Sequence, residues 1–210
     1  MNVDDISYVG VGFFLDGEVG ERLVNISERF ASQCDSWWRL SQGRFPPHIS
    51  CWLAYMPSSN LPDLQQIVAE KCRTLSPFHA HVKDAHQEAS GHVLYRIREQ
   101  SRFKCIHSAL LDVLNPLREG YIHPKYTSRL ADMSRQERAN VQSFGTRFVD
   151  VLFSAHITVA VTSQPVKSEI SAIAPTLNAL LDMNRITVWR QATSGVAVEV
   201  LDAYDMGHVE

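Results

Sequence analysis

Two short motifs carry the residue types best suited to chemistry. The first is His-Ile-Ser at residues 48–50, and the second is His-Ile-Thr at residues 156–158. Both continue into apolar residues that favour a β-strand. Because alternate side chains of a strand share a face, the histidine and the hydroxyl of each motif point one way, and the isoleucine points into the core.

Two imidazoles and two hydroxyls suit chemistry at a phosphoryl group. An unperturbed imidazole has a pKa of about 6.5, so one neutral histidine can take a proton from water while a protonated one gives a proton to a leaving oxygen. The hydroxyls of Ser50 and Thr158 can donate hydrogen bonds to phosphoryl oxygens and hold the phosphorus in line. The opening of a cyclic phosphodiester by His48 and His156 needs these groups and neither a metal nor a cofactor.

The elements that must position the first motif alternate between strand and helix patterns. Residues 18–30 have apolar positions in steps of four, three and four, which is the period of one helix face. Similar spacing predicts a helix over 61–75. Short apolar and β-branched runs predict strands at 6–15, from His48 onward, at 78–85 and at 92–98.

The second half repeats this order. We expect a helix over 103–117, two short strands within 148–161 broken near Ser154, a helix from Ile170 to Leu181, and strands at 185–191 and 195–203. Each motif histidine lies roughly 30 residues before a strand, with one amphipathic helix between. The chain therefore reads as two copies of one α+β unit, whose motifs converge at a cleft.

Two such motifs that open strands of a duplicated α+β unit resemble the 2H phosphoesterase superfamily, which includes 2′-5′ RNA ligase-like proteins and cyclic nucleotide phosphodiesterases. The resemblance implies one bilobal domain over 1–210, with two antiparallel sheets facing a central groove and helices on the outer faces. It also implies that His48 and His156 are the acid/base pair and that Ser50 and Thr158 bind phosphate. The implied substrate is a 2′,3′-cyclic phosphate or related diester of a nucleotide or RNA end. Which histidine is the base stays open, and so does ligation, the reverse reaction.

A polar stretch at 118–147 departs from the first half, where the corresponding connection is shorter. This stretch could be a lid that stacks a base or meets phosphate, or a solvated loop with a short helix. Its residues that suit a lid are Tyr121, His123, Lys125, Tyr126 and Arg129.

Two functions from other classes stay open. The same groove could bind an RNA end or nucleotide without turning it over. Alternatively, His79 and His81 lie two residues apart on a strand and could hold a metal ion together with His86 or His92, because imidazole is a common transition-metal ligand.

Two residues that follow the first histidine have expected orientations. Trp52 shares the strand parity of His48 and Ser50, so it either lines the groove, where it could stack on a base, or belongs to the core. Cys51 has the opposite parity and is expected to point into the core, which argues against a thiol nucleophile.

Composition narrows the class of partner. The 210 residues include 20 Lys plus Arg against 23 Asp plus Glu, a formal charge of −3, so no global attraction to a DNA duplex or an anionic membrane is expected. The four cysteines form no C-x-x-C pair, and the first residues lack the basic start of a signal peptide. We expect a soluble, cytoplasmic monomer whose partner is a nucleotide or an RNA terminus carrying a cyclic phosphate.

Overall fold

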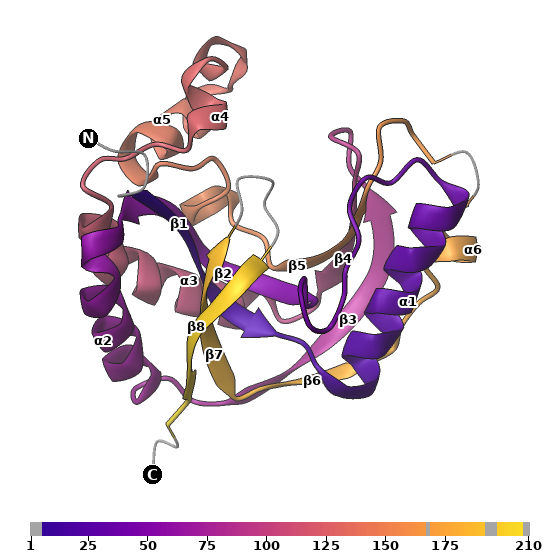
Figure 1. Ribbon diagram of the computed structural model, residues 1–210, viewed down its shortest axis with the longest axis horizontal. Coiled ribbons are helices and arrows are strands. Elements are labelled where there is room, and N and C mark those ends of the chain that lie inside the picture. The colour runs from indigo at the N-terminus through magenta and orange to yellow at the C-terminus, as the bar shows by residue number, and fades with distance from the viewer. Residues whose placement is uncertain (1–5, 167–168, 192–196, 208–210) are drawn as a thin grey trace.

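The computed structural model describes residues 6–166, 169–191 and 197–207. Within these residues, two four-stranded antiparallel sheets form the two lobes of the molecule, as Figure 1 shows. The β1 sheet has the order β2-β1-β7-β8, with β1 (Ile6–Phe14), β2 (His48–Pro57), β7 (Arg185–Gln191) and β8 (Ala197–Asp205). The β4 sheet has the order β5-β4-β3-β6, with β3 (Phe78–Gln87), β4 (His92–Ile97), β5 (His156–Val161) and β6 (Leu180–Met183). The expected α+β class with two antiparallel sheets is confirmed.

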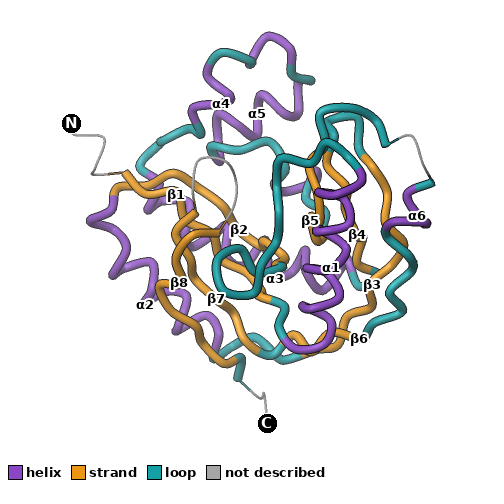
Figure 2. The backbone as a smooth tube through the Cα atoms, turned by 45° about the vertical axis from the view of Figure 1, so that its right-hand side comes forward, coloured by secondary structure: helices purple, strands orange, loops and turns teal. Residues whose placement is uncertain are grey.

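The long helices cover the sheets in a crossed arrangement. Helix α1 (Gly17–Gln33) follows β1 in the chain yet packs against β5 of the other sheet (Figure 2). Helix α3 (Gln100–Leu114) follows β4 yet packs against β2, beside α2 (Leu61–Cys72). Each helix buries the apolar stripe that its sequence spacing predicts, such as Leu23, Ile26 and Phe30 of α1. The two lobes therefore share one continuous core.

Each sheet draws strands from both halves of the chain, so the lobes are not the two sequence halves. Strands β7 and β8 from the C-terminal half extend the β1 sheet, and β3 from the N-terminal half lies between β4 and β6. The motif strands nevertheless take equivalent places. Strand β2 is the edge strand beside β1, and β5 is the edge strand beside β4. The duplication therefore holds for the strand pairs that carry the motifs.

Two predicted elements are wrong. The expected strand before Ser154 is a 3₁₀ turn at Asp150–Leu152, because Asp150 has a φ of 52°, which no strand accommodates. The expected helix from Ile170 ends as the short α6 (Ile170–Ile173), and the chain then enters β6. Pro175 explains the early end, since a proline disfavours helical backbone at the residue before it.

The polar stretch at 118–147 folds into helices, which stand above the β1 sheet in Figure 1. It contains α4 (Pro124–Thr127) and α5 (Arg135–Phe144), around a small core of Tyr126, Met133 and Val141. A capping box at the start of α5 joins Ser134 and Glu137. Of the residues that suit a lid, His123 and Tyr126 are buried, Lys125 and Arg129 are exposed, and Tyr121 is partly buried.

His123 attaches this stretch to the β1 sheet. Its ring contacts Tyr8 and Tyr55 edge-on, with centroids 4.9 and 4.8 Å away, and these two tyrosines stack on each other at 4.5 Å. Burial, aided by the charge of Lys125, lowers the pKa of His123 to about 4. The imidazole is therefore neutral at pH 7, and its Nδ1 accepts a hydrogen bond from the Lys125 backbone N–H.

Acid should destabilise the fold through this histidine. The pKa of His123 is lower in the folded state than in the unfolded one, so the unfolded state binds the proton first, and stability falls as the pH drops from about 6.5 towards 4. The loss should approach about 3 kcal/mol. Urea unfolding at several pH values should show this slope in the natural protein and a flatter one in His123→Asn, which keeps an acceptor for Lys125. Equal slopes in the two proteins would contradict this assignment.

No helix in the described parts of the chain combines the length and apolar character that a membrane span requires.

Candidate active site

The two motif histidines are held in the same way. His48 opens β2, and its Nδ1 lies 3.0 Å from the carbonyl oxygen of Pro46. His156 opens β5, and its Nδ1 lies 2.8 Å from the carbonyl oxygen of Ser154. A carbonyl can only accept a hydrogen bond, so each Nδ1 carries the proton and donates it. Nε2 is thereby the ring nitrogen left to take or give a proton at both sites.

The hydroxyls share the face of their histidines. Ser50 pairs with Gly12 of β1, and Thr158 pairs with Leu94 of β4; both hydroxyl residues are partly exposed. The isoleucines between them, Ile49 and Ile157, are fully buried. Each motif thus presents an imidazole and a hydroxyl on one side of its strand and anchors the strand through its isoleucine.

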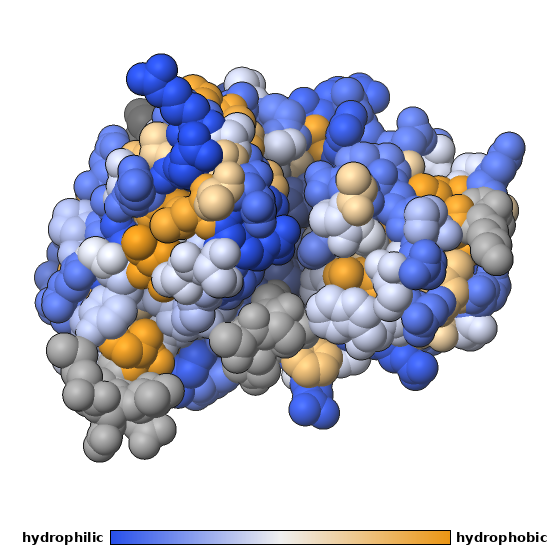
Figure 3. Space-filling view, turned by 90° about the horizontal axis from the view of Figure 1, so that it is seen from above, coloured by the Kyte–Doolittle hydropathy of each residue, from blue (hydrophilic) through white to orange (hydrophobic). Residues whose placement is uncertain are grey.

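The structure brings the two motifs close together. Strands β2 and β5 are in contact although they belong to different sheets. Figure 3 shows the surface hollowed between the two lobes. The pKa of His48 is lowered, chiefly by burial and further by the charge of His156, while the hydrogen bond to Pro46 acts in the opposite direction. His48 is therefore neutral at pH 7, the form that a general base requires.

Aromatic side chains surround His48. Its ring centroid lies 6.1 Å from that of Phe14 and 5.3 Å from that of Trp189. The Trp189 indole lies across Gly10, where an added Cβ would come within 2.3 Å of the ring. A glycine at this point lets the buried indole pack flat on the sheet beside His48.

Gly12 permits an equally close approach between β1 and the first motif. A Cβ at this position would lie 2.1 Å from the carbonyl oxygen of Ile49, and that backbone atom has little freedom to move. We expect Gly12→Ala to lower the free energy of unfolding by about 2 to 3 kcal/mol, as overpacking does in well-packed interiors. Urea midpoints provide the measurement. Gly43→Ala is the matched control because no atom of the described residues lies within 4 Å of its added Cβ; equal effects at both glycines would disprove the packing argument.

Of the two places that the sequence left open for Trp52, the structure shows the core, because a β-bulge interrupts the alternation of side chains along β2. Gly12 pairs with Ser50 and the neighbouring Val11 pairs with Trp52, which leaves Cys51 as the extra residue. The side chain of Trp52 therefore turns to the core face opposite Val11 and is only 3% exposed. Cys51 is buried, as predicted, and its burial raises the pKa of the thiol, which disfavours the thiolate.

The β4 strand adds an unpredicted cation beside the second motif. Arg96 pairs directly with His156 and is exposed, whereas its neighbours Tyr95 and Ile97 are buried on the opposite face. Arg96 therefore lies on the face of His156. Phe14 takes the equivalent position beside His48, so the first histidine has an aromatic neighbour and the second a cationic one. No sequence pattern pointed to Arg96, because its position depends on how the strands pair.

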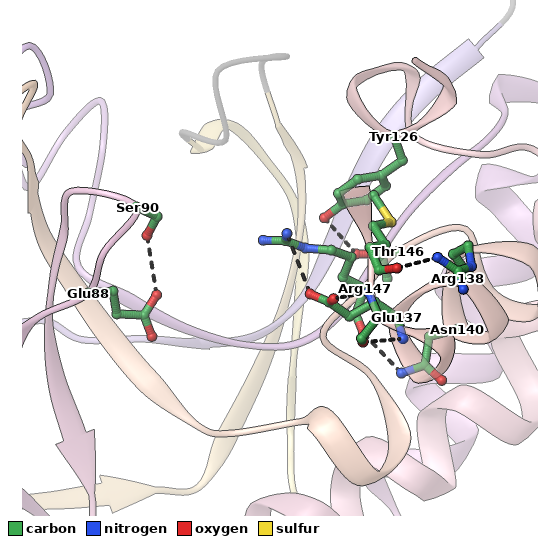
Figure 4. A network of polar contacts seen from close by, with 10 residues as sticks. Glu88, Ser90, Tyr126, Glu137, Arg138, Asn140, Thr146 and Arg147 are labelled. Atoms are coloured by element: carbon green, nitrogen blue, oxygen red, sulfur yellow. Dashed lines mark hydrogen bonds and ion pairs between the residues drawn. The ribbon is translucent and has the colours of Figure 1, made fainter. Parts of the chain in front are cut away.

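The inserted stretch at 118–147 lies near this end of the groove. Burial lowers the pKa of His92, and the charges of His156 and Lys125 lower it further, so these groups lie within electrostatic reach of one another. In Figure 4, Arg147 extends from the end of this stretch towards Glu88 and Ser90 on the β3–β4 turn.

Arg147 is held by its own neighbours. Its guanidinium lies 3.5 Å from a carboxylate oxygen of Glu137 and stacks over the ring of Phe148 at 4.4 Å. These two contacts hold the guanidinium in place at the end of the inserted stretch.

The histidines considered as metal ligands have separate partners. Nδ1 of His79 lies 2.6 Å from Asp182, and Nδ1 of His81 lies 2.8 Å from Glu99. His86 pairs with Leu94, farther along the sheet. Among the described residues, no group of three or more His, Cys, Asp or Glu side chains is arranged to hold a metal ion.

Solved structures share this architecture. No family model matches the sequence, and no curated protein does either. The crystal structure of TT0787 from Thermus thermophilus matches with a TM-score of 0.64 at 15% identity, over 98% of this chain and 100% of that one. E. coli LigT in complex with 3′-AMP matches with a TM-score of 0.61 at 13% identity, over 97% of this chain and 100% of that one.

Two further sets of structures extend this comparison. A structure described as a phosphoesterase has a TM-score of 0.53 at 14% identity, over 96% of this chain and 99% of that one. LigT has also been crystallised with phosphate, ATP and NADP+. At these identities the comparison establishes the fold alone: the chain has the fold of TT0787, of LigT and of the structure described as a phosphoesterase.

Proposed function

We propose that this protein is a phosphoesterase that hydrolyses a 2′,3′-cyclic phosphate, or a related phosphodiester, of a nucleotide or RNA end. One observation carries the proposal: two copies of one His-x-Ser/Thr unit meet across two sheets, each with its histidine Nδ1 donating to the carbonyl two residues earlier. These groups supply an acid, a base and phosphate donors from the protein itself, so the reaction needs no metal ion.

His48 is the proposed base and His156 the proposed acid. The lowered pKa of His48 keeps its Nε2 free to accept a proton from water. The water oxygen then forms a bond to phosphorus as the bond from phosphorus to the 2′ or 3′ oxygen breaks. Nε2 of a protonated His156 gives its proton to that leaving oxygen, so one proton enters the histidine pair and one leaves it.

The remaining groups hold the phosphate and the nucleoside. Ser50 and Thr158 donate to the non-bridging oxygens as their negative charge grows in the transition state. Arg96, beside His156, adds positive charge on the same face. Phe14, beside His48, offers an apolar surface to the ribose or base.

The structural comparisons support this choice of substrate. LigT, which shares the fold, has been crystallised with a nucleoside monophosphate and with phosphate. Another protein of this fold thus forms complexes with phosphate and with a nucleoside monophosphate. We extend that ligand class to the present chain because its own histidines and hydroxyls suit the same chemical group.

A panel of nucleoside 2′,3′-cyclic phosphates tests the proposal, assayed with and without excess EDTA. We expect ring opening that EDTA does not change and a single phosphomonoester product, 2′ or 3′. Activity that EDTA abolishes would overturn the two-histidine mechanism. Tight binding of these nucleotides without turnover would favour a binding module instead.

A further inference from the structure

Helix α3 contacts the backbone beside both motifs through two polar side chains. Gln100 is the first residue of the helix, and His107 lies two turns farther along it. We call these two residues the α3 clamp. Both side chains bind backbone groups next to the motifs, Gln100 at Ala155 and His107 at Cys51 and Asp150.

Gln100 fixes the residue immediately before His156. Its carboxamide oxygen accepts a hydrogen bond from the N–H of Ala155 at 2.9 Å, and its amide nitrogen donates to the carbonyl oxygen of Ala155 at 2.8 Å. The same nitrogen also donates to the carbonyl of Ile97 at the end of β4, at 2.8 Å. Ala155 lies between His156 and Ser154, whose carbonyl holds the imidazole. Gln100 therefore sets the direction of the backbone that orients His156.

In the first motif, prolines restrain the backbone before the histidine. Pro46 and Pro47 precede His48, and each pyrrolidine ring fixes its own φ angle. The carbonyl of Pro47 also accepts a hydrogen bond from the Leu15 N–H at 2.8 Å. The second motif has serine and alanine at these two places, which leave the backbone freer. The side chain of Gln100 on α3 therefore restrains the backbone before His156, as the two prolines restrain the backbone before His48.

His107 connects a backbone group next to the first motif with one in the turn before the second. The ring is 1% exposed and stacks on Phe153 with centroids 4.1 Å apart. Its Nδ1 donates to the carbonyl of Cys51, the bulge residue beside Ser50, at 2.6 Å. Its Nε2 accepts from the N–H of Asp150, in the turn before β5, at 2.9 Å. Burial lowers the pKa of His107, which agrees with a neutral ring that has one donor and one acceptor.

We infer that Gln100 and His107 are positioning residues, which set the distance and direction between the two His-x-Ser/Thr motifs during catalysis. The inference rests on the proposed function but assigns these residues a role that touches neither substrate nor reacting atoms. Because a misplacement of about 1 Å can cost roughly 10²-fold in rate, loss of this clamp should reduce kcat by about 10- to 100-fold. KM should change less than about threefold, since the phosphate ligands remain.

Gln100→Met tests the role of Gln100 in the α3 clamp, because methionine keeps the length of the side chain and loses its hydrogen bonds. Gln66→Met is the control, since Gln66 is exposed on α2 and its hydrogen bond among the described residues is to the Glu70 side chain. We expect Gln100→Met to lower kcat in the natural background and to cause no further loss in His156→Ala. An equal loss in both backgrounds would mean that Gln100 only supports the fold, and would overturn its positioning role.

The role of His107 is tested by whether a substitution that keeps one of its hydrogen bonds retains activity. His107→Phe keeps the ring on Phe153 and loses both hydrogen bonds, whereas His107→Asn keeps a donor near the Cys51 carbonyl. We expect His107→Asn to retain more of kcat than His107→Phe when both are assayed well below their melting temperatures. Equal kcat values for the two variants would contradict a role for the Cys51 contact.

A measurement without substrate separates this inference from the proposed function. In ¹H–¹³C NMR spectra, Gln100→Met should shift the imidazole resonances of His156 and their titration midpoint, while those of His79 stay in place. Gln66→Met should move neither. If the natural protein opens no cyclic phosphate and yet Gln100→Met moves His156 alone, the proposed function fails and the clamp stands. Unchanged His156 resonances would overturn the clamp whatever the activity.

Discussion

Replacement of His48 or His156 by alanine is expected to lower kcat for cyclic phosphate opening by about 10²- to 10⁴-fold, the usual contribution of one general acid or base. Each imidazole makes one hydrogen bond within the described residues, to a nearby carbonyl, and is partly exposed. Its loss should therefore remove the proton transfer without unfolding the protein. Steady-state kinetics on the panel of 2′,3′-cyclic phosphates provide the measurement.

The effect should not be additive, because the two histidines act in one step. The double variant His48→Ala/His156→Ala is expected to be little worse than the more damaged single variant. Melting curves serve as the control that the variants remain folded, and His79→Ala serves as the matched substitution, since that histidine is exposed and pairs with Asp182. Full turnover in His48→Ala would remove this residue from the mechanism.

Loss of either hydroxyl should have the next largest effect. Ser50→Ala and Thr158→Val are expected to lower kcat/KM by about 10- to 10³-fold, in the range found for single donors to a developing negative charge. Valine keeps the shape of threonine, so the packing beside Leu94 is preserved. Thr158→Ser should recover most of the activity because it restores the donor.

A control for the hydroxyl variants lies on the outer surface. Ser32 on α1 is exposed, and in the part of the chain that the structure describes its hydroxyl donates to a carbonyl of its own helix, so Ser32→Ala should leave the kinetics unchanged. If Ser50→Ala and Thr158→Val behave like Ser32→Ala, the phosphate is held by other groups, and Arg96 becomes the first residue to test.

Sequence periodicity was sufficient for the elements that carry the site. The apolar steps of α1 and the β-rich runs at 6–15 and from His48 onward correspond to helix and strands in the structure. These elements are specified locally, by the period of their apolar residues. The two motifs were recognisable for the same reason, since each lies at the start of such a strand.

What the sequence could not show depends on contacts between distant segments. The bulge at Cys51 exists because of the pairing of β2 with β1, and it places Trp52 in the core, one of the two positions that the sequence left open. The place of Arg96 beside His156 requires the register of β4 with β5. Likewise, the sequence places His107 on the buried face of α3 like its apolar neighbours. Only the fold shows that its two ring nitrogens bind the backbone of Cys51 and Asp150.

The crossed packing of α1 and α3 explains why two chain halves do not form two lobes. Each helix covers the sheet to which its preceding strand does not belong, so neither half could bury its apolar stripe alone. The two motif strands are thereby held in contact across the lobes. In this fold, the geometry of the site depends on the shared core rather than on either sheet.

The pH dependence of kcat/KM, measured for the natural protein beside His48→Ala and His156→Ala, tests the acid/base assignment most directly. We predict a bell-shaped profile for the natural protein. Its acidic limb should lie below pH 6.5, because the pKa of His48 is lowered and the base is lost when His48 is protonated. His48→Ala should lose the acidic limb, and His156→Ala should lose the alkaline one. A rate that only climbs with pH, or two limbs that persist in both variants, would contradict catalysis by this pair of histidines.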